Sequence, residues 1–412
     1  MKKTKWIARV LAIILALAMI CGSAFYLIYI VAPASYNTYA LDAADVEKLY
    51  RLEEVIKMIE NNYRDKLKGS ELVDAAYQGV FDALDKWSVY YASKDDEAEF
   101  TNQLTGEKYA GVGMTIVDYE GQVYVCDLNT KGPAYGAGVQ VGDIITAING
   151  ASIKKLTLDQ VQAKLRGKAG TSLTVKLLRD GKTISVKLVR KELTVSSVRA
   201  KIFDSETGKE ISDILNLTSK KNLIGYIKID EFDDGTARAF ATELQILKSA
   251  GITKLIIDLR DNPGGYMNEA LECVSNFLKK GTKLTSYIKQ GKTIGTEKSY
   301  QDGQYKFNMV LLVDENSASA SDAFAAIFKD YKLGKIVGEN TFGKGVAQEI
   351  FRLSDGSSMK LSTCYFTTPK GKQIHEVGTK PDIEVVSEHD MTEMAILKLE
   401  DLQLKKALEV LK

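Results

Sequence analysis

Hydrophobic and polar positions follow a different pattern in each part of this chain. No residue between Val10 and Leu41 is charged, and the stretch is strongly apolar as far as Ala32. From Val46 to Ile59, apolar residues recur at steps of three and four, which is typical of an amphipathic helix. A second run of this kind extends from Leu72 to Leu84. We therefore predict a helical region over residues 42–105.

After Tyr109 the pattern changes to short β-like runs separated by glycine turns. These runs are GVGMTIV, QVYVCDL, DIITAING, SLTVKLLRDG and TISVKLV. One helical piece, from Leu158 to Leu165, lies between them. Short strands with one or two helices predict a small, partly open β-barrel over residues 106–195.

From residue 222 onwards, strands and helices alternate. We predict a strand at LIGYIKI and an amphipathic helix from Thr236 to Ala250. We predict a second strand at KLIIDLR, whose continuous apolar residues suit a sheet buried on both faces. The unit repeats as FNMVLLVDE, a serine-rich stretch with its helix, and KIVGE. This predicts an α/β core with right-handed crossovers over residues 196–386, closed by an ordinary helix over 387–412. The fold class expected for the whole chain is α+β with several domains.

Composition narrows the class of protein. With 412 residues the chain exceeds one typical domain, and its 45% of apolar residues indicate a globular protein. Its 55 basic and 54 acidic residues give a formal net charge of +1, so nothing favours nucleic-acid binding. The four cysteines lie far apart and form no CxxC, which favours buried thiols over disulfides or a zinc site: Cys21, Cys126, Cys273 and Cys364.

Residues 1–41 predict a single-pass membrane anchor. The apolar stretch exceeds the ~7–15 apolar residues of a cleavable signal and can span a bilayer as a helix. Four basic residues precede it, which are Lys2, Lys3, Lys5 and Arg9. Positive flanks stay in the cytoplasm, so everything after about residue 35 is expected to face outward. Cleavage after Ala34 or Ala40 is the alternative.

Two strand-to-helix corners could carry chemistry, because functional loops lie at the carboxyl ends of strands in such sheets. One is DNPGG after Ile257, and the other is ENSASAS after Val313. In the second, Ser319 or Ser321 begins a helix that runs to about Lys329. Serine is a common helix N-cap, so the corner alone does not establish a nucleophile.

A serine nucleophile also needs a base to take its proton. The chain has only two histidines, His375 and His389, and His389 lies in a charged tail segment, which disfavours a serine–histidine triad. Lys344 in TFGKGVAQ is the other candidate. Burial near apolar Phe342 would lower the pKa of this lysine from ~10.4 towards ~7–8 and let it act as a base. An exposed loop lysine is the alternative that this motif leaves open.

Two segments of the β-rich region resemble a PDZ domain. GPAYGAGVQVGDIITAINGASI matches the helix-to-strand signature of these domains, and YAGVGMTI matches their carboxylate-binding loop. In PDZ domains a peptide's C-terminus adds as a strand, and loop amides hold its carboxylate. The resemblance implies that four residues surround this carboxylate, namely Ala110, Gly111, Val112 and Gly113.

Taken together, the motifs resemble the carboxy-terminal processing peptidases, or tail-specific proteases, a serine–lysine family with an embedded PDZ domain. DLRDNPGGYMNEA, ENSASASDAF, GENTFGKGVAQ and YFTTPKGKQIHEVGTKPDI occur in the family's order and spacing. The resemblance covers the chain from about residue 45 to Val386, and it implies a crotonase-like protease core.

The resemblance assigns roles to single residues. Ser319 matches the nucleophile, Lys344 the general base, and Gln348 the glutamine that hydrogen-bonds and orients this lysine. The family's oxyanion-hole amides fall on Gly264 or Gly265 together with Ala320.

Two more charged residues have proposed roles. Asp330 matches an acidic position whose role is more structural than catalytic. Arg166 ends the predicted PDZ helix and is either a solvated surface residue or a switch that couples tail binding to the protease core.

The resulting hypothesis is a membrane-anchored bacterial serine endopeptidase whose catalytic part lies outside the cytoplasm and needs no metal or cofactor. Its partners would be protein or peptide substrates with accessible C-termini, and its helical region would serve as a homodimerisation arm or a buttress. Two alternatives remain from the sequence: a non-catalytic PDZ scaffold with a protease-like core, and a crotonase-like acyl-transfer enzyme that binds coenzyme A.

Overall fold

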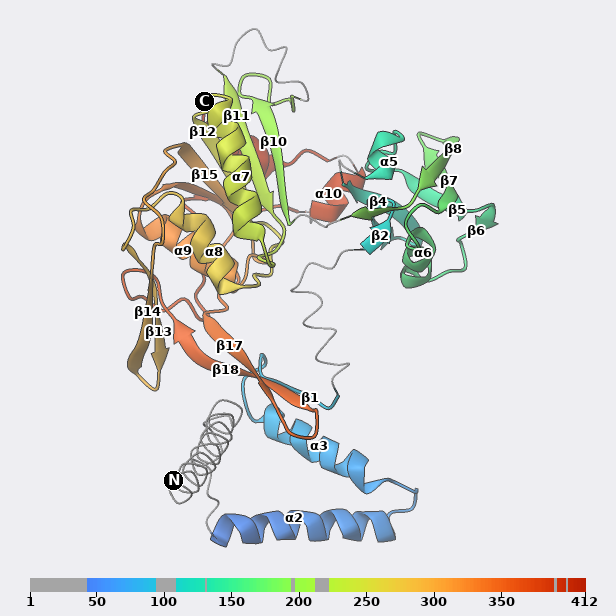
Figure 1. Ribbon diagram of the computed structural model, residues 1–412, viewed down its shortest axis with the longest axis vertical. Coiled ribbons are helices and arrows are strands. Elements are labelled where there is room, and N and C mark those ends of the chain that lie inside the picture. The colour runs from blue at the N-terminus through green and yellow to red at the C-terminus, as the bar shows by residue number, and fades with distance from the viewer. Residues whose placement is uncertain are drawn as a thin grey trace, which may run out of the picture. The chain divides into compact units, whose positions relative to one another are not determined.

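The computed structural model describes residues 43–93, 109–129, 132–193, 197–211, 222–388, 391–397 and 399–412. The chain divides into two compact units, one ending at Ala83 and the other extending from Leu84 to Lys412 (Figure 1). The predicted membrane anchor at 1–41 lies outside the described residues. Within those residues, no helix combines the length and the apolar composition that a membrane crossing requires.

The first unit contains the two predicted amphipathic helices, α2 (Ala43–Asn62) and α3 (Gly69–Asp82). Many of their apolar side chains are exposed, among them Tyr50 at 68%, Met58 at 59% and Val80 at 61%. Exposed apolar side chains in this number favour an interaction surface.

Residues 109–193 form the β-rich domain. Its main sheet is antiparallel and contains β3 (Met114–Tyr119), β4 (Gln122–Leu128), β5 (Ile144–Ile148), β7 (Ser172–Arg179) and β8 (Lys182–Val189), with β6 (Ala151–Ser152) beside β5. A separate pair joins β2 (Tyr109–Gly111) and β9 (Lys191–Leu193). The helices are α5 (Pro133–Gly136) and α6 (Leu158–Leu165), and α6 has the bounds that its apolar pattern predicted. Val125, Val161 and Val175 are fully buried between these elements.

The larger domain is built on a six-stranded sheet in the order β10-β11-β12-β15-β16-β19. The strands are β10 (Val198–Asp204), β11 (Leu223–Ile229), β12 (Lys254–Asp258), β15 (Asn308–Val313), β16 (Gly334–Gly338) and β19 (Ile383–Glu384). All neighbours are parallel except β10, which is antiparallel to β11. Every residue of β11 is buried, as expected of a sheet covered on both faces.

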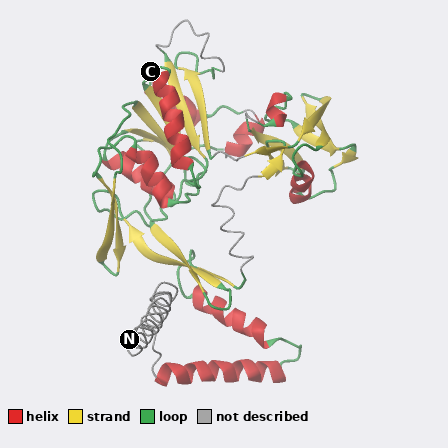
Figure 2. Cartoon of the chain, viewed as in Figure 1, coloured by secondary structure: helices red, strands yellow, loops and turns green. Residues whose placement is uncertain are grey.

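Helices cover both faces of this sheet (Figure 2). Leu255 and Ile257 of β12 pack with α7 (Thr236–Ser249), α8 (Met267–Ser275) and α9 (Ala320–Asp330). Ile256, between them, packs on the opposite face with α11 (Leu402–Val410). A short helix, α10 (Met391–Leu397), precedes α11. The predicted α/β core is confirmed by this alternation, since successive residues of a strand point to opposite faces.

A second sheet has the order β1-β18-β13-β14, with β17 beside β18. Its strands are β1 (Val89–Tyr91), β13 (Lys283–Lys289), β14 (Lys292–Lys298), β17 (Val346–Arg352) and β18 (Ser358–Phe366). The prediction of a helical region up to residue 105 is therefore wrong for β1. Its Val-Tyr-Tyr sequence favours a strand, and pairing with β18 buries Tyr90 to 6% exposure.

The thiols are less buried than the sequence predicted. Cys273 is buried, whereas Cys126 and Cys364 are half-buried, and all three are free. Both lie in strands that are themselves only partly buried. Cys21 lies outside the described residues.

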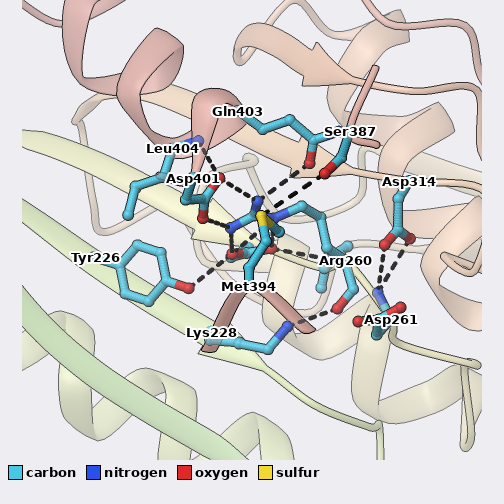
Figure 3. Close-up of polar contacts among 12 residues, drawn as sticks. Tyr226, Lys228, Arg260, Asp261, Asp314, Ser387, Met394, Asp401, Gln403 and Leu404 are labelled. Atoms are coloured by element: carbon cyan, nitrogen blue, oxygen red, sulfur yellow. Dashed lines mark hydrogen bonds and ion pairs between the residues drawn. The ribbon is translucent and has the colours of Figure 1, made fainter. Parts of the chain in front are cut away.

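Arg260, just after β12, is the centre of a buried polar network (Figure 3). Its guanidinium is 1% exposed and donates to three side chains, which are Asp258, Asp401 and Gln403. The Tyr226 hydroxyl donates to Asp258 at 2.7 Å, and Lys228 Nζ donates to the Arg260 carbonyl oxygen at 2.6 Å. Since Asp401 is also the N-cap of α11, the C-terminal helix is more than a closing element. It is bound to the strand that leads into the DNPGG turn.

Replacement of Asp401 tests this network. Asp401→Ala should lower the free energy of unfolding by about 3 kcal/mol, because it removes a carboxylate from a buried guanidinium. Urea unfolding measures the change. The control is the neighbouring Glu400→Ala, whose exposed ion pair with Lys405 contributes less than about 1 kcal/mol. If the two variants unfold alike, Asp258 alone is enough to hold Arg260.

Candidate active site

Ser319 lies at the corner between β15 and α9 and is the N-cap residue of α9. Its backbone angles are φ 57° and ψ −108°, outside the regions that residues with a Cβ normally adopt. Such strain persists only where the surroundings enforce it, and it is often found at functional sites. Here the Ala318 N–H donates to the Asn262 carbonyl oxygen at 3.0 Å, and the Ser319 N–H donates to Asp322 Oδ2 at 2.8 Å.

The DNPGG turn packs directly against this corner. Gly264 and Gly265 have φ values of +107° and +118°, which favour glycine. A Cβ on Gly264 would lie 2.8 Å from the Ser319 Cβ, and one on Gly265 would overlap the Phe232 carbonyl oxygen. Gly264 is therefore required for the close approach of the two corners, and Gly265 for the close approach of the turn to Phe232.

The sequence left Gly264 and Gly265 as alternatives for the oxyanion hole. Their backbone N–H groups differ in whether they already donate a hydrogen bond. The Gly264 N–H donates to Asn262 Oδ1 at 2.9 Å and is therefore engaged. The Gly265 N–H and the Ala320 N–H donate to no acceptor in the part of the chain that the structure describes. The amides available to an external oxygen are those of Gly265 and Ala320.

Lys344 lies in the loop between β16 and β17. Its Nζ lies 4.6 Å from the centre of the Trp87 ring, and Phe342 packs edge-on against the same ring with centroids 5.5 Å apart. Burial lowers the pKa of Lys344 to about 8, as the sequence predicted, and nearby Lys360 acts in the same direction. The sequence assigned the apolar cover to Phe342, but Phe342 is 44% exposed and Trp87 provides the direct contact.

Gln348 of β17 lies near the same tryptophan. Its Nε2 donates to the Trp87 carbonyl oxygen at 2.7 Å. Among the described residues, no hydrogen bond joins Lys344 Nζ to Ser319 Oγ or to Gln348. The lysine and the glutamine thus share Trp87 as a neighbour and do not contact each other through a hydrogen bond.

Asp322 is a site residue that the motifs did not single out. Its side chain is fully buried, and burial raises its pKa while its hydrogen bonds oppose that shift. Besides the Ser319 N–H, it accepts the Thr341 hydroxyl at 2.5 Å and the N–H groups of Gly343 and Lys344, both at 2.9 Å. One carboxylate therefore joins the backbone of Ser319 to that of Lys344. An acidic residue three positions after a helix N-cap is a capping-box signal that could have identified it.

The four predicted PDZ loop residues connect β2 to β3, and their role in binding a carboxylate stays a prediction. Ala110 and Gly111 end β2, and Val112 and Gly113 form the turn into β3. Gly113 has φ +76°, and a Cβ there would lie 2.9 Å from the Gly132 Cα. The loop therefore needs glycine to approach the 132 turn.

The remaining predicted residues lie outside this cluster. Arg166 is the C-cap residue of α6 and its side chain is exposed, so a switch role stays a prediction. Asp330 accepts the Lys370 N–H at 3.0 Å at the far end of α9, which agrees with a structural role. His375 is half-buried, and its Nδ1 has no hydrogen-bond partner among the described residues. His389 lies outside those residues.

Comparison with known proteins shows two family matches. The model for peptidase family S41 matches residues 223–385, and the model for the PDZ domain matches residues 124–179.

Curated relatives and solved structures agree with these matches. A "Probable CtpA-like serine protease" of Staphylococcus aureus (strain bovine RF122 / ET3-1) is 30% identical over 388 residues, which cover 93% of this chain and 73% of the relative. The protein of the same name from Staphylococcus haemolyticus (strain JCSC1435) is 29% identical over 355 residues, covering 86% and 68%. The crystal structure of a "Putative S41 protease" from Bacteroides fragilis NCTC 9343 has a similar fold, with a TM-score of 0.53 and 14% identity over 91% of this chain and 97% of that one. By its family match and its similarity to these relatives, this chain belongs to peptidase family S41 and is a serine protease that carries a PDZ domain.

Proposed function

We propose that this protein is an endopeptidase that binds protein C-termini through its PDZ domain and cleaves through an acyl-enzyme on Ser319, with Lys344 as the base. The observation that carries this proposal is the clamp made by Asp322, whose carboxylate binds the backbone N–H groups of both a strained serine and a lysine of lowered pKa. A serine needs such a partner, because its hydroxyl is a weak nucleophile at neutral pH.

The proposed reaction begins when Ser319 Oγ attacks the scissile carbonyl carbon and its proton passes to neutral Lys344. The oxyanion accepts hydrogen bonds from the N–H groups of Gly265 and Ala320, next to the positive end of the α9 dipole. Lysine then gives the proton to the leaving amine. Water hydrolyses the acyl-enzyme by the same steps, with Lys344 again as the base.

Lys344 must move from its position over Trp87 to form a hydrogen bond with Ser319 Oγ. Its backbone need not move, since Asp322 already holds the N–H groups of both residues. A lysine side chain has four rotatable bonds, and catalytic hydrogen bonds often form only when the substrate is bound. Gln348 could then accept a hydrogen bond from the ammonium through its Oε1.

The location that we propose is the outer face of the cell membrane, with residues 1–41 as the anchor. The support is the uncharged stretch from Val10 behind four basic residues. Full-length protein should stay with membranes under alkaline extraction, and release into the soluble fraction would contradict an anchor.

The exposed apolar residues of α2 and α3 support a homodimer through these helices. Sedimentation velocity tests this, and a monomer at micromolar concentration would argue against it.

A catalytic role is tested against a non-catalytic scaffold by a fluorophosphonate probe, which should label the wild-type protein and not Ser319→Ala.

The role of Lys344 as the base is tested by the pH dependence of the acylation rate. A neutral amine is the active form, so the acylation rate should rise with pH to a half-maximum near the Lys344 pKa of about 8 and level off above it. Lys344→Arg should be slower by at least about 10²-fold, because a guanidinium does not lose its proton. Lys335→Arg, at an exposed position, is the control. Appreciable turnover by the Lys344→Arg variant would exclude this lysine as the base.

The clamp is tested by Asp322→Asn, which keeps the shape of the side chain. The amide nitrogen cannot accept. Depending on which oxygen it replaces, either the Ser319 and Lys344 N–H groups, which share Oδ2, or the Gly343 N–H group, on Oδ1, lose their acceptor in a buried site, at a cost of about 1–3 kcal/mol for each group. We expect kcat to fall by about 10²-fold with little change in KM, because the reacting groups lose alignment. Steady-state kinetics measure both constants. Asp355→Asn, which also accepts a backbone N–H but is exposed, should behave as the wild type.

Recognition by the PDZ domain is tested by amidating the C-terminus of a peptide substrate. Amidation removes the carboxylate that the loop from Ala110 to Gly113 would bind, so cleavage should weaken. Equal kcat/KM values for the amidated and free peptides would show that this loop does not read the terminus.

A further inference from the structure

Trp87 comes from a part of the chain that lies far from Lys344 in the sequence. It precedes strand β1 and the whole β-rich domain, whereas Lys344 follows β16. No motif of the family resemblance included it. In the structure, however, it contacts both Lys344 and Gln348.

Several contacts hold Trp87 firmly at this place. Asp85 Oδ1 accepts the Trp87 N–H at 2.8 Å and the Ser88 N–H at 3.0 Å. The Ser362 hydroxyl of β18 donates to the same carboxylate at 3.2 Å, and the Ser362 N–H donates to Ser88 Oγ. Pairing of β1 with β18 begins two residues later, at Val89. The position of the ring is therefore set by the second sheet.

Two different groups of Trp87 make the contacts with the site. The indole ring covers the Lys344 ammonium at 4.6 Å, and the backbone carbonyl oxygen accepts Gln348 Nε2 at 2.7 Å. Because the amide nitrogen is engaged, Oε1 is the atom of Gln348 that remains to accept from a lysine.

We propose that Trp87 is a positioning residue for the lysine base: its ring excludes water from Lys344, and its carbonyl oxygen sets the orientation of the Gln348 amide. This inference rests on the proposed function, since it assumes that Lys344 must be neutral to act.

The ring has two opposing effects on Lys344. A cation over an aromatic face is attracted to it, which favours the ammonium form, whereas exclusion of water favours the neutral amine. Burial is the largest influence on this lysine, and its pKa is lowered overall. We therefore expect exclusion of water by the ring to outweigh the attraction, so that removal of the ring raises the pKa of Lys344.

Other charged groups near Lys344 act on its pKa with the ring in place. Asp85, before β1, and Asp322, in α9, favour the ammonium, whereas Lys360 of β18 disfavours it. Lys86 Nζ lies 4.7 Å from the Trp87 ring. None of these groups is removed by a substitution at Trp87, so a shift in pKa would report the ring itself.

The experiment measures the rate at which a fluorophosphonate labels Ser319 in the full-length protein as a function of pH. Trp87→Gln should move the half-maximal pH upward by about one unit, so that labelling at pH 7 is about tenfold slower. Trp87→Phe keeps an apolar ring and should keep the wild-type midpoint. Val89→Ala is the matched control, since it weakens packing in the same segment without uncovering the lysine, and its midpoint should not move.

The outcomes separate this inference from the proposed function. A Trp87→Gln variant that keeps the wild-type midpoint, at whatever rate, shows that Trp87 only supports the fold. A midpoint shift of the same size in Val89→Ala would also overturn the inference. If the Lys344→Arg variant is labelled like the wild type, the lysine mechanism itself fails. If Trp87→Gln does not fold, Trp87→Leu gives the same test, because its smaller side chain also admits water and should raise the midpoint.

Discussion

One buried carboxylate, that of Asp322, connects the two halves of the site. Burial of a charge without partners is costly, and here four donors surround it: the Thr341 hydroxyl and the N–H groups of Ser319, Gly343 and Lys344. Because three of these donors are backbone groups, the carboxylate determines where the chain runs and leaves the functional side chains free to move. The strained φ of Ser319 is maintained by the same bond.

The two corners that meet at Ser319 do so because of the strand order in the main sheet. Strands β12 and β15 are parallel neighbours, with Ile257 opposite Leu311, so their carboxyl ends lie side by side. The DNPGG turn follows one strand and the serine corner follows the other. Gly264 then allows contact with the serine corner at a distance that a Cβ would forbid, and Gly265 allows the same turn to approach Phe232. Beneath this turn, the Arg260 network links the start of the loop to the C-terminal helix, so residues after 400 also support the site.

The second sheet contributes the surroundings of the lysine. Its strand β1 is separated in sequence from the rest of the protease domain by the β-rich domain, yet it pairs with β18 and brings Trp87 over Lys344. The low pKa of Lys344 is thus not a property of the FGKG motif alone. It depends on an aromatic ring that is more than 250 residues away in the sequence, as the residue numbers show.

The sequence by itself determined those features of this protein that depend on the local pattern of apolar and polar residues. The periodicity of α2, α3 and α6, the apolar strands of the core and the two strand-to-helix corners were predictable, because side-chain spacing reflects which face is buried. The motifs were specific enough to indicate the family and to select Ser319 and Lys344 as candidates. The capping-box spacing of Asp322 was also visible, although its second function, the bond to the Lys344 loop, was not. Only the tertiary structure decided contacts between distant segments: Trp87 over Lys344, Asp401 on Arg260, β1 in the second sheet, and Gly265 rather than Gly264 as the glycine with an available N–H. These depend on which segments become neighbours in three dimensions, and a pattern of local spacing carries no information about that.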